Sequence, residues 1–197
     1  ELDSSFYRGI QTWIKLLLSG YKKFIYAGND AHGNFNKYRQ ISIPMISIHE
    51  KDTQILGECR TGVIVDDKKS IIDSTINSLK NGKCFITNGP ELTIEAYSKK
   101  KVLMGQTLKT NSTKIYIKFN STEEFSTDGI IMFYVGKLAE YLEELFLEVK
   151  ISNFSFKKII ELNIKESIYV RAEFRGESYR GRRIALTNPI WIKPANS

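Results

Sequence analysis

The stretch Lys114-Ile-Tyr-Ile-Lys-Phe119 has an Ile or Phe at every second position, which is the pattern of a β-strand with one buried face. Runs with the same rhythm recur after residue 90, separated by turn-forming Gly, Asn, Ser and Lys residues, and they cover 92–96, 129–135, 167–174 and 184–186. Regularly spaced short strands of this kind predict an antiparallel, Ig-like β-sandwich over residues 91–197. Residues 139–149 fit a helix by their Glu, Leu and Tyr content, or a strand pair by their position between strands.

Aromatic side chains are frequent in this half of the chain, and alternation places most of them on core faces. We interpret them as core residues, with a carbohydrate-binding platform as the alternative. They are Tyr116, Phe119, Phe133, Tyr134, Tyr169, Phe174 and Trp191. Tyr179, which lies among arginines, is the aromatic residue that we expect to be most exposed.

The first ninety residues contain two helical patterns. Apolar residues on one broad face predict an amphipathic helix over 3–19, which Gly20 ends. A second helix is expected to begin at Asp67 or Ser70 and to run to about Lys80. The residues of the second helix that we expect to face inward are Ile71, Ile72, Thr75, Ile76 and Leu79.

Extended segments lie between and after these helices, at 24–27 and 84–86, and Asn88-Gly89-Pro90 predicts a turn. Helix, strand and loop in this order are typical of an α/β segment, which we assign to residues 1–90. The fold class predicted for the whole chain is therefore α+β, with a boundary between two domains near residue 90.

Asp30 and His32 stand one residue apart in a glycine-flanked loop directly after the segment 24–27. Carboxylate oxygen suits hard divalent cations and imidazole suits zinc, manganese or iron, so the pair is one half of a metal site. The other interpretation is a loop Asp that caps a turn, with a histidine packed nearby. The only other histidine, His49, lies in a polar stretch and reads as a solvated loop residue.

Composition limits the classes of function. The chain has 197 residues, 42% of them hydrophobic, which is enough for a core, and no apolar run is long enough to span a bilayer. The formal charge of +7 comes from scattered lysines and arginines, so nucleic acid is an unlikely partner and an anionic small molecule a better one. Two separated cysteines, Cys59 and Cys84, indicate reduced thiols, and with no signal-peptide pattern we favour a cytoplasmic location.

Six short motifs span nearly the whole chain in a recognisable order. They are Trp13-Ile-Lys-Leu-Leu-Leu-Ser-Gly20, Ala27-Gly-Asn-Asp-Ala-His-Gly33, Gly57-Glu-Cys-Arg-Thr61, Ile76-Asn-Ser-Leu-Lys-Asn-Gly-Lys-Cys-Phe-Ile-Thr-Asn-Gly-Pro90, Gly105-Gln-Thr-Leu108 and Ala185-Leu-Thr-Asn-Pro-Ile190. Together they resemble the C-terminal portion of PHP-domain (polymerase and histidinol phosphatase superfamily) metal-dependent hydrolases, in the branch with a C-terminal β-sandwich.

This resemblance implies a site and an activity. Asp30 and His32 would be the last metal ligands of a site for zinc, manganese or iron, and residues 1–90 would be the last strand–helix units of the PHP barrel. The family's other ligands, including a His-x-His pair, lie upstream, and this chain contains no His-x-His. The implied function is the C-terminal part of a phosphoesterase, inactive as this chain alone, acting on a phosphate ester in the complete enzyme.

Three further expectations complete the sequence interpretation. Arg60 is expected either to contact a substrate phosphate, which its guanidinium fits, or to pair with Glu58 or Asp66. Loss of most of a barrel would expose apolar surface around Trp13 and Leu17 and favour self-association. The alternative function is a non-catalytic β-sandwich module that binds a protein or glycan partner.

Overall fold

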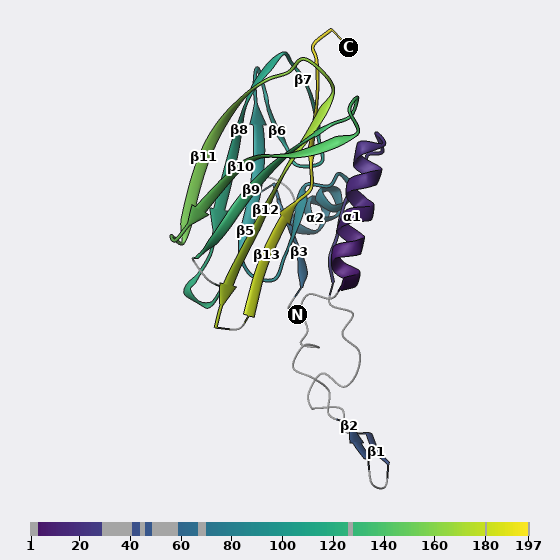
Figure 1. The fold of residues 1–197 in the computed structure, drawn as a ribbon, viewed down its shortest axis with the longest axis vertical. Coiled ribbons are helices and arrows are strands. Elements are labelled where there is room, and N and C mark those ends of the chain that lie inside the picture. The colour runs from purple at the N-terminus through teal and green to yellow at the C-terminus, as the bar shows by residue number, and fades with distance from the viewer. Residues whose placement is uncertain are drawn as a thin grey trace.

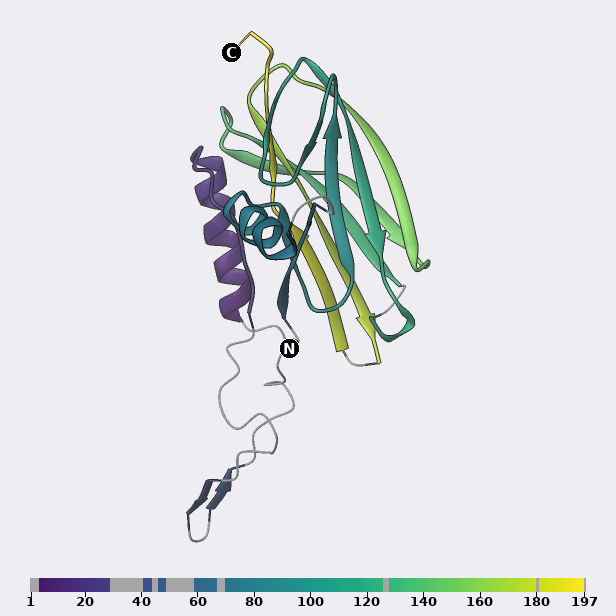
Figure 2. The same cartoon turned by 180° about the vertical axis from the view of Figure 1, so that it is seen from behind.

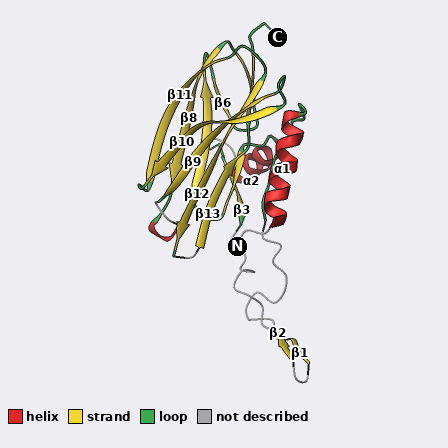
Figure 3. Ribbon diagram, in the orientation of Figure 1, coloured by secondary structure: helices red, strands yellow, loops and turns green. Residues whose placement is uncertain are grey.

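Two large β-sheets face each other, and two helices lie beside the larger sheet (Figures 1 and 3). This arrangement is seen in a computed structural model that describes residues 4–28, 41–43, 46–48, 59–66, 70–125, 128–179 and 181–196. The helices are α1 (Ser4–Leu18) and α2 (Ile71–Lys80), with a short 3₁₀ helix, η2 (Glu123–Phe125). None of the described helices is long and apolar enough to cross a membrane.

The larger sheet has eight strands, and its main path runs β10-β9-β12-β13-β4-β3. Two further strands, β14 and β7, pair with each other in parallel, and β14 also pairs with β12. The strands are β3 (Arg60–Val63), β4 (Cys84–Thr87), β7 (Thr107–Lys109), β9 (Gly129–Lys137), β10 (Leu142–Ile151), β12 (Ile168–Ser178), β13 (Gly181–Thr187) and β14 (Ile190–Lys193).

The smaller sheet has four antiparallel strands in the order β11-β8-β5-β6. They are β5 (Glu91–Tyr97), β6 (Lys101–Leu103), β8 (Ser112–Asn120) and β11 (Ser155–Asn163). A separate antiparallel pair joins β1 (Ile41–Ile43) to β2 (Ile46–Ile48). Helices and mostly antiparallel sheets together confirm the α+β class.

The main core lies between the two large sheets and follows the alternation read from the sequence. In β8, Ile115, Ile117 and Phe119 are buried. Phe119 meets Phe174 of the facing sheet with 4.6 Å between ring centroids. The period-2 pattern therefore identified the inner face of this strand correctly. The expectation that most of the aromatic residues are core residues is also confirmed, although Tyr116 and Tyr134 are only half-buried.

Residues 139–149, for which the sequence left helix and strand open, belong mainly to a strand. β10 pairs with β9 along its whole length, with a bulge between Leu145 and Leu147. The inward side chains Leu147 and Val149 pack against the main core. Pairing with β9 and the core contacts decide the conformation, because local helix propensity is weak against tertiary packing.

Helix α1 covers the outer face of the eight-stranded sheet. Trp13 and Leu17 are 6% and 0% exposed, and they pack with Tyr169 of β12 and Trp191 of β14. The expected exposed apolar surface around Trp13 and Leu17 is therefore wrong, because this sheet supplies the surface that covers them. Gly20, at a φ of 82°, ends the helix as predicted.

The inward face predicted for helix α2 is only partly correct, because Thr75 and Leu79 are half-buried but the three isoleucines are exposed. Its buried residues are Ser74 and Ser78, whereas Ile71, Ile72 and Ile76 are 71%, 67% and 47% exposed. Ser78 donates its hydroxyl hydrogen to the carbonyl of Ile64, and the Ser74 hydroxyl accepts from the N–H of Asp66. The serine face is turned inward because it hydrogen-bonds the chain that leaves β3, and the isoleucines consequently face outward. Figure 2 shows α2 beside α1 on the side facing the viewer.

The segment 24–27, predicted as a strand, is extended but belongs to no sheet. The neighbouring strands β3 and β4 flank α2 and pair antiparallel, unlike the parallel strands of an α/β barrel. β4 also pairs with β13, so one sheet contains residues on both sides of residue 90. The domain boundary near residue 90 remains a prediction.

Replacement of Leu17 by Ala tests the docking of α1. We expect the free energy of unfolding to fall by about 2–5 kcal/mol, because the side chain is fully buried and its removal leaves a cavity. Leu16→Ala is the matched control: Leu16 is 37% exposed, and we expect a change of roughly 0.5 kcal/mol. Urea denaturation followed by circular dichroism measures both, and equal losses would contradict the packing described.

Candidate functional site

The extended segment 24–28 leads into the loop of the predicted metal ligands, and a buried asparagine holds it. Asn188 is fully buried. Its Oδ1 accepts from the N–H of Ile25 at 2.8 Å, and its Nδ2 donates to the carbonyls of Ile25 and Cys84 at 3.1 Å each. One side-chain amide therefore gives the segment the hydrogen bonds that a neighbouring strand would normally provide.

Thr61 of β3 fixes the end of the same segment. Its Oγ1 accepts from the N–H of Ala27 at 2.9 Å and donates to the carbonyl of Ala27 at 3.0 Å. Gly28 follows directly, so the chain leaves the sheet beside the strand to which it returns at Cys59 and Arg60. Asp30 and His32 come two and four residues after this exit, and with His49 they lie outside the described residues.

A cavity of about 410 Å³ opens beside the exit. Its walls come from the inner face of α1, from the segment 24–28, and from Cys59 and Ile86. Phe6, Ile10 and Trp13 make the helix side apolar. The cavity therefore gives an apolar surround to the point where the predicted metal loop begins, and it adds no acid or histidine of its own.

Arg60 lies at a corner formed by three separate segments. Its guanidinium carbon is 5.4 Å from the centroid of the Phe125 ring, and that of Arg183 is 5.6 Å from the same centroid. Arg183 is 3% exposed and donates to the carbonyl of Asn88 at 3.1 Å and to the Ser178 hydroxyl at 3.0 Å. Over the described ranges, neither guanidinium forms an ion pair with a carboxylate, so the proposed Arg60–Asp66 pair is not formed. The alternative partner, Glu58, is outside these ranges.

The described residues do not complete a metal site by themselves. Within the part of the chain that the structure describes, no three His, Cys, Asp or Glu residues gather closely enough to hold an ion. Cys84, the thiol nearest the exit segment, is buried beside the Asn188 amide, whose Nδ2 is 3.1 Å from its Sγ. Burial raises the pKa of Cys84 to about 11, more than the hydrogen bond from Asn188 lowers it. Cys84 is thus a neutral thiol at physiological pH.

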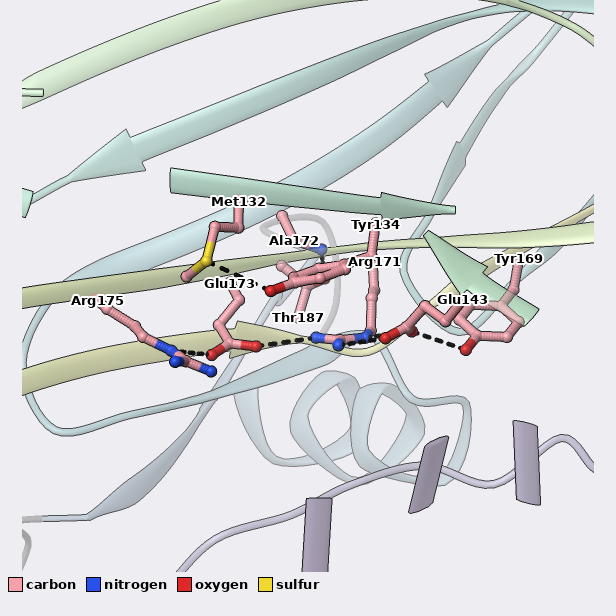
Figure 4. A network of polar contacts seen from close by, with 9 residues as sticks. All are labelled: Met132, Tyr134, Glu143, Tyr169, Arg171, Ala172, Glu173, Arg175 and Thr187. Carbon is pink, nitrogen blue, oxygen red and sulfur yellow. Dashed lines mark hydrogen bonds and ion pairs between the residues drawn. The ribbon is translucent and has the colours of Figure 1, made fainter. Parts of the chain in front are cut away.

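The densest polar cluster lies elsewhere, on the outer face of the eight-stranded sheet under α1 (Figure 4). Arg171 is 2% exposed and binds both carboxylate oxygens of Glu143, from Nε at 2.8 Å and from Nη2 at 2.7 Å. Its Nη1 donates to Glu173 at 3.2 Å, and Glu173 also accepts from Arg175 at 2.5 Å. Tyr169 donates its hydroxyl hydrogen to Glu143 at 2.7 Å.

The pKa values of Arg171 and Tyr169 in this cluster are both shifted upward, away from neutral pH. Burial lowers the pKa of Arg171, but hydrogen bonding and attraction from Glu143 and Glu173 outweigh this, and the net pKa is raised. For Tyr169, burial and the negative charge of Glu143 both raise the pKa. Arg171 also stacks on the ring of Tyr134, 4.2 Å from its centroid. Each charge is matched, so neither group titrates near neutral pH.

The sequence interpretation did not identify this cluster. Arg171 and Glu173 stand two residues apart within an apolar run, which is a signal that charges share one face of a buried strand. Glu143 lies 28 residues earlier on β10, which is separated from β12 in the sheet by β9. Only the pairing of three strands brings this partner into range.

Comparisons with known proteins do not assign the chain. No family model, no curated protein and no solved structure matches it.

The thiol of Cys84 provides a test of the site's interior. We expect iodoacetamide at pH 8 to leave Cys84 unmodified in the folded protein and to modify it in denaturant, as read by peptide mass spectrometry. The thiol ionises near pH 9.0 when free and near pH 11 when folded, so its contribution to stability is complete below pH 9 and is lost as the pH rises towards 11. Equal labelling of Cys84 in the folded and unfolded protein would contradict its burial.

Proposed function

We propose that the chain is the C-terminal part of a PHP-type metal-dependent hydrolase, a phosphoesterase, in which Asp30 and His32 supply two of the metal ligands. Further ligands are needed, because two ligands rarely hold a divalent ion against water and catalytic zinc sites supply three, and the resemblance implies that they lie upstream of this chain. By itself the chain is then inactive.

The convergence of the motif residues carries this proposal. Asn188 of the last motif hydrogen-bonds Cys84 of the fourth, and Thr61 of the third binds Ala27 of the second. Gly105 of the fifth donates its N–H to the carbonyl of Pro189 at 2.8 Å. A Cβ at Gly105, whose φ is 80°, would lie 1.9 Å from the carbonyl oxygen of Asn81. Five motifs far apart in the sequence thus meet around the segment that leads to Asp30 and His32.

The roles of the residues follow from this placement. Asn188 and Thr61 would hold the segment 25–27, which precedes the proposed ligands in the sequence, in a fixed position against β3 and β4. A divalent metal bound there would lower the pKa of a bound water and stabilise charge on the phosphoryl oxygens. Arg60 and Arg183 would favour an anionic substrate, since within the described ranges no carboxylate neutralises either guanidinium.

The outward face of α2 would be a docking surface for the rest of the barrel. Ile71, Ile72 and Ile76 are exposed, and Tyr26, 49% exposed, lies against the end of the same helix through a 2.7 Å hydrogen bond to the Leu79 carbonyl. Exposed apolar residues that gather on one helix commonly mark an interface. Tyr26 belongs to the segment that precedes Asp30 in the sequence, so this face and the proposed ligands lie close together along the chain.

We also propose that the two facing sheets form an Ig-like β-sandwich. The support is the largely antiparallel pairing and the shared core between β8 and β12, shown by the contact of Phe119 with Phe174. The non-catalytic binding module remains the second candidate function, because the four-stranded sheet carries a groove that the hydrolase proposal does not use.

Metal binding tests the proposed ligands. In equilibrium dialysis against millimolar zinc or manganese, we expect the parent chain to bind metal weakly, because it supplies two ligands, but to bind more than the Asp30→Ala/His32→Ala variant, as measured by elemental analysis. His49→Ala is the control and should bind as the parent does. Equal retention by the parent and the double variant would remove these two residues from the proposal.

The face of α2 can be tested separately. Ile72→Gln/Ile76→Gln should reduce the binding of a hydrophobic dye and any self-association in sedimentation, because it removes exposed apolar surface. The thermal midpoint should change little, since surface substitutions alter stability by roughly 0.5 kcal/mol. Asn77→Gln on the same helix is the control. A large fall in thermal midpoint for the double variant would mean that these isoleucines pack internally.

A further inference from the structure

The outer face of the four-stranded sheet carries a groove of about 510 Å³, on the sheet that does not contain the metal-loop exit. It lies where β5 ends, β8 begins and β11 ends. On these strands Ala96, Ile115 and Ile160 point into the core, and the side chains between them point outward. The outward residues that define the groove are Tyr97, Ser112, Lys114, Tyr116, Glu161 and Asn163.

Two tyrosines form the apolar part of the groove. Tyr97 lies opposite Lys114 in the β5–β8 register, and Tyr116 is two residues further along β8 on the same face. Their side chains are therefore diagonal neighbours, at a spacing of roughly 7–8 Å. Tyr97 is 48% exposed and Tyr116 is half-buried, and across the described chain neither phenol hydroxyl has a hydrogen-bond partner. An exposed ring with a free hydroxyl offers a stacking surface and a polar tip together.

Hydrogen-bond donors and acceptors border the two tyrosine rings. Lys114 and Glu161 lie side by side on β8 and β11, with 3.2 Å between Nζ and Oε1, and their side chains are 55% and 74% exposed. The Asn163 amide next to them forms no hydrogen bond with any described residue. The groove thus presents an ammonium donor, a carboxylate acceptor and an amide that offers both, within reach of the two rings.

We infer that this groove binds a neutral oligosaccharide. A sugar ring has an apolar face of C–H groups that stacks on an aromatic ring, and its adjacent hydroxyls each donate and accept, which suits the Lys114–Glu161 pair and Asn163. This inference does not depend on the proposed hydrolase function, because the groove uses none of the residues around the segment 24–28.

The charges on this face argue against a nucleic acid or another polyanion as the ligand. Glu95 pairs with both Lys101 and Lys118, at 3.4 and 3.0 Å, and Lys114 is paired with Glu161. Lys101, Lys114 and Lys118 are thus each paired with a carboxylate of the same sheet, which leaves Lys99 as the groove lysine without a carboxylate partner among the described residues. The exposed Glu161 carboxylate would repel a phosphate but can accept hydrogen bonds from sugar hydroxyls.

Calorimetric titration of the full chain with cellohexaose, chitohexaose and maltohexaose at millimolar concentration tests the inference. We expect saturable binding of at least one of these probes. Tyr97→Ala and Tyr116→Ala should each weaken it about tenfold, because each removes a stacking surface. Tyr97→Phe keeps the ring and should retain most of the affinity. Tyr21→Ala, at an exposed tyrosine away from the groove, should bind as the parent does.

The same titrations contain the results that would overturn the inference. These are no binding of any of the three sugars, or sugar binding that Tyr97→Ala and Tyr116→Ala leave unchanged while thermal denaturation shows both to be folded. Binding of single-stranded oligothymidine in place of the sugars, weakened by added salt, would assign the groove to nucleic acid instead.

Discussion

The side-chain amide of Asn188 is the interaction on which the rest of the site depends. Residues 24–27 have no partner strand. Leaving the N–H and the C=O of Ile25 without hydrogen bonds would therefore cost the folded state about 1–3 kcal/mol for each group. Asn188 satisfies both and also binds Cys84 in β4. It thereby fixes the extended segment against the eight-stranded sheet. The segment that Asn188 holds in this way forms one wall of the cavity under α1.

The two helices beside the eight-stranded sheet have different kinds of inner face, and each suits the groups that it covers. Arg171 and Arg175 neutralise Glu143 and Glu173 beneath α1, and the guanidinium carbon of Arg171 lies 5.9 Å from the centroid of the Trp13 ring. A helix with an aromatic inner face can therefore cover buried charges without leaving one unpaired. The inner face of α2 meets unpaired backbone groups near the end of β3 instead, and its serines satisfy them. The isoleucines of α2 consequently remain exposed.

Much of the fold could be predicted from local patterns. The helix at 3–19, the limits of α2, and the strands at 92–96 and 114–119 were all identified, because periodicity and end signals are local properties. β11 was missed because Ile159 beside Ile160 breaks the alternation, although Ile159 is exposed on the outer face. The inward face predicted for α2 was only partly correct because an amphipathic pattern shows that a helix has an apolar face but not which side of it the rest of the chain covers.

The sequence by itself determined the α+β class, the inner face of β8 and the pairing of Asp30 with His32 one residue apart. These depend on side-chain order along a single segment. Tertiary structure decided which distant residues are in contact. It places the amide of Asn188 against Ile25, 163 residues earlier, and it pairs Arg171 with Glu143 across β9. It also forms the tyrosine groove from three strands. Such contacts depend on strand register and sheet order, which residues distant in the sequence set jointly and no local pattern records.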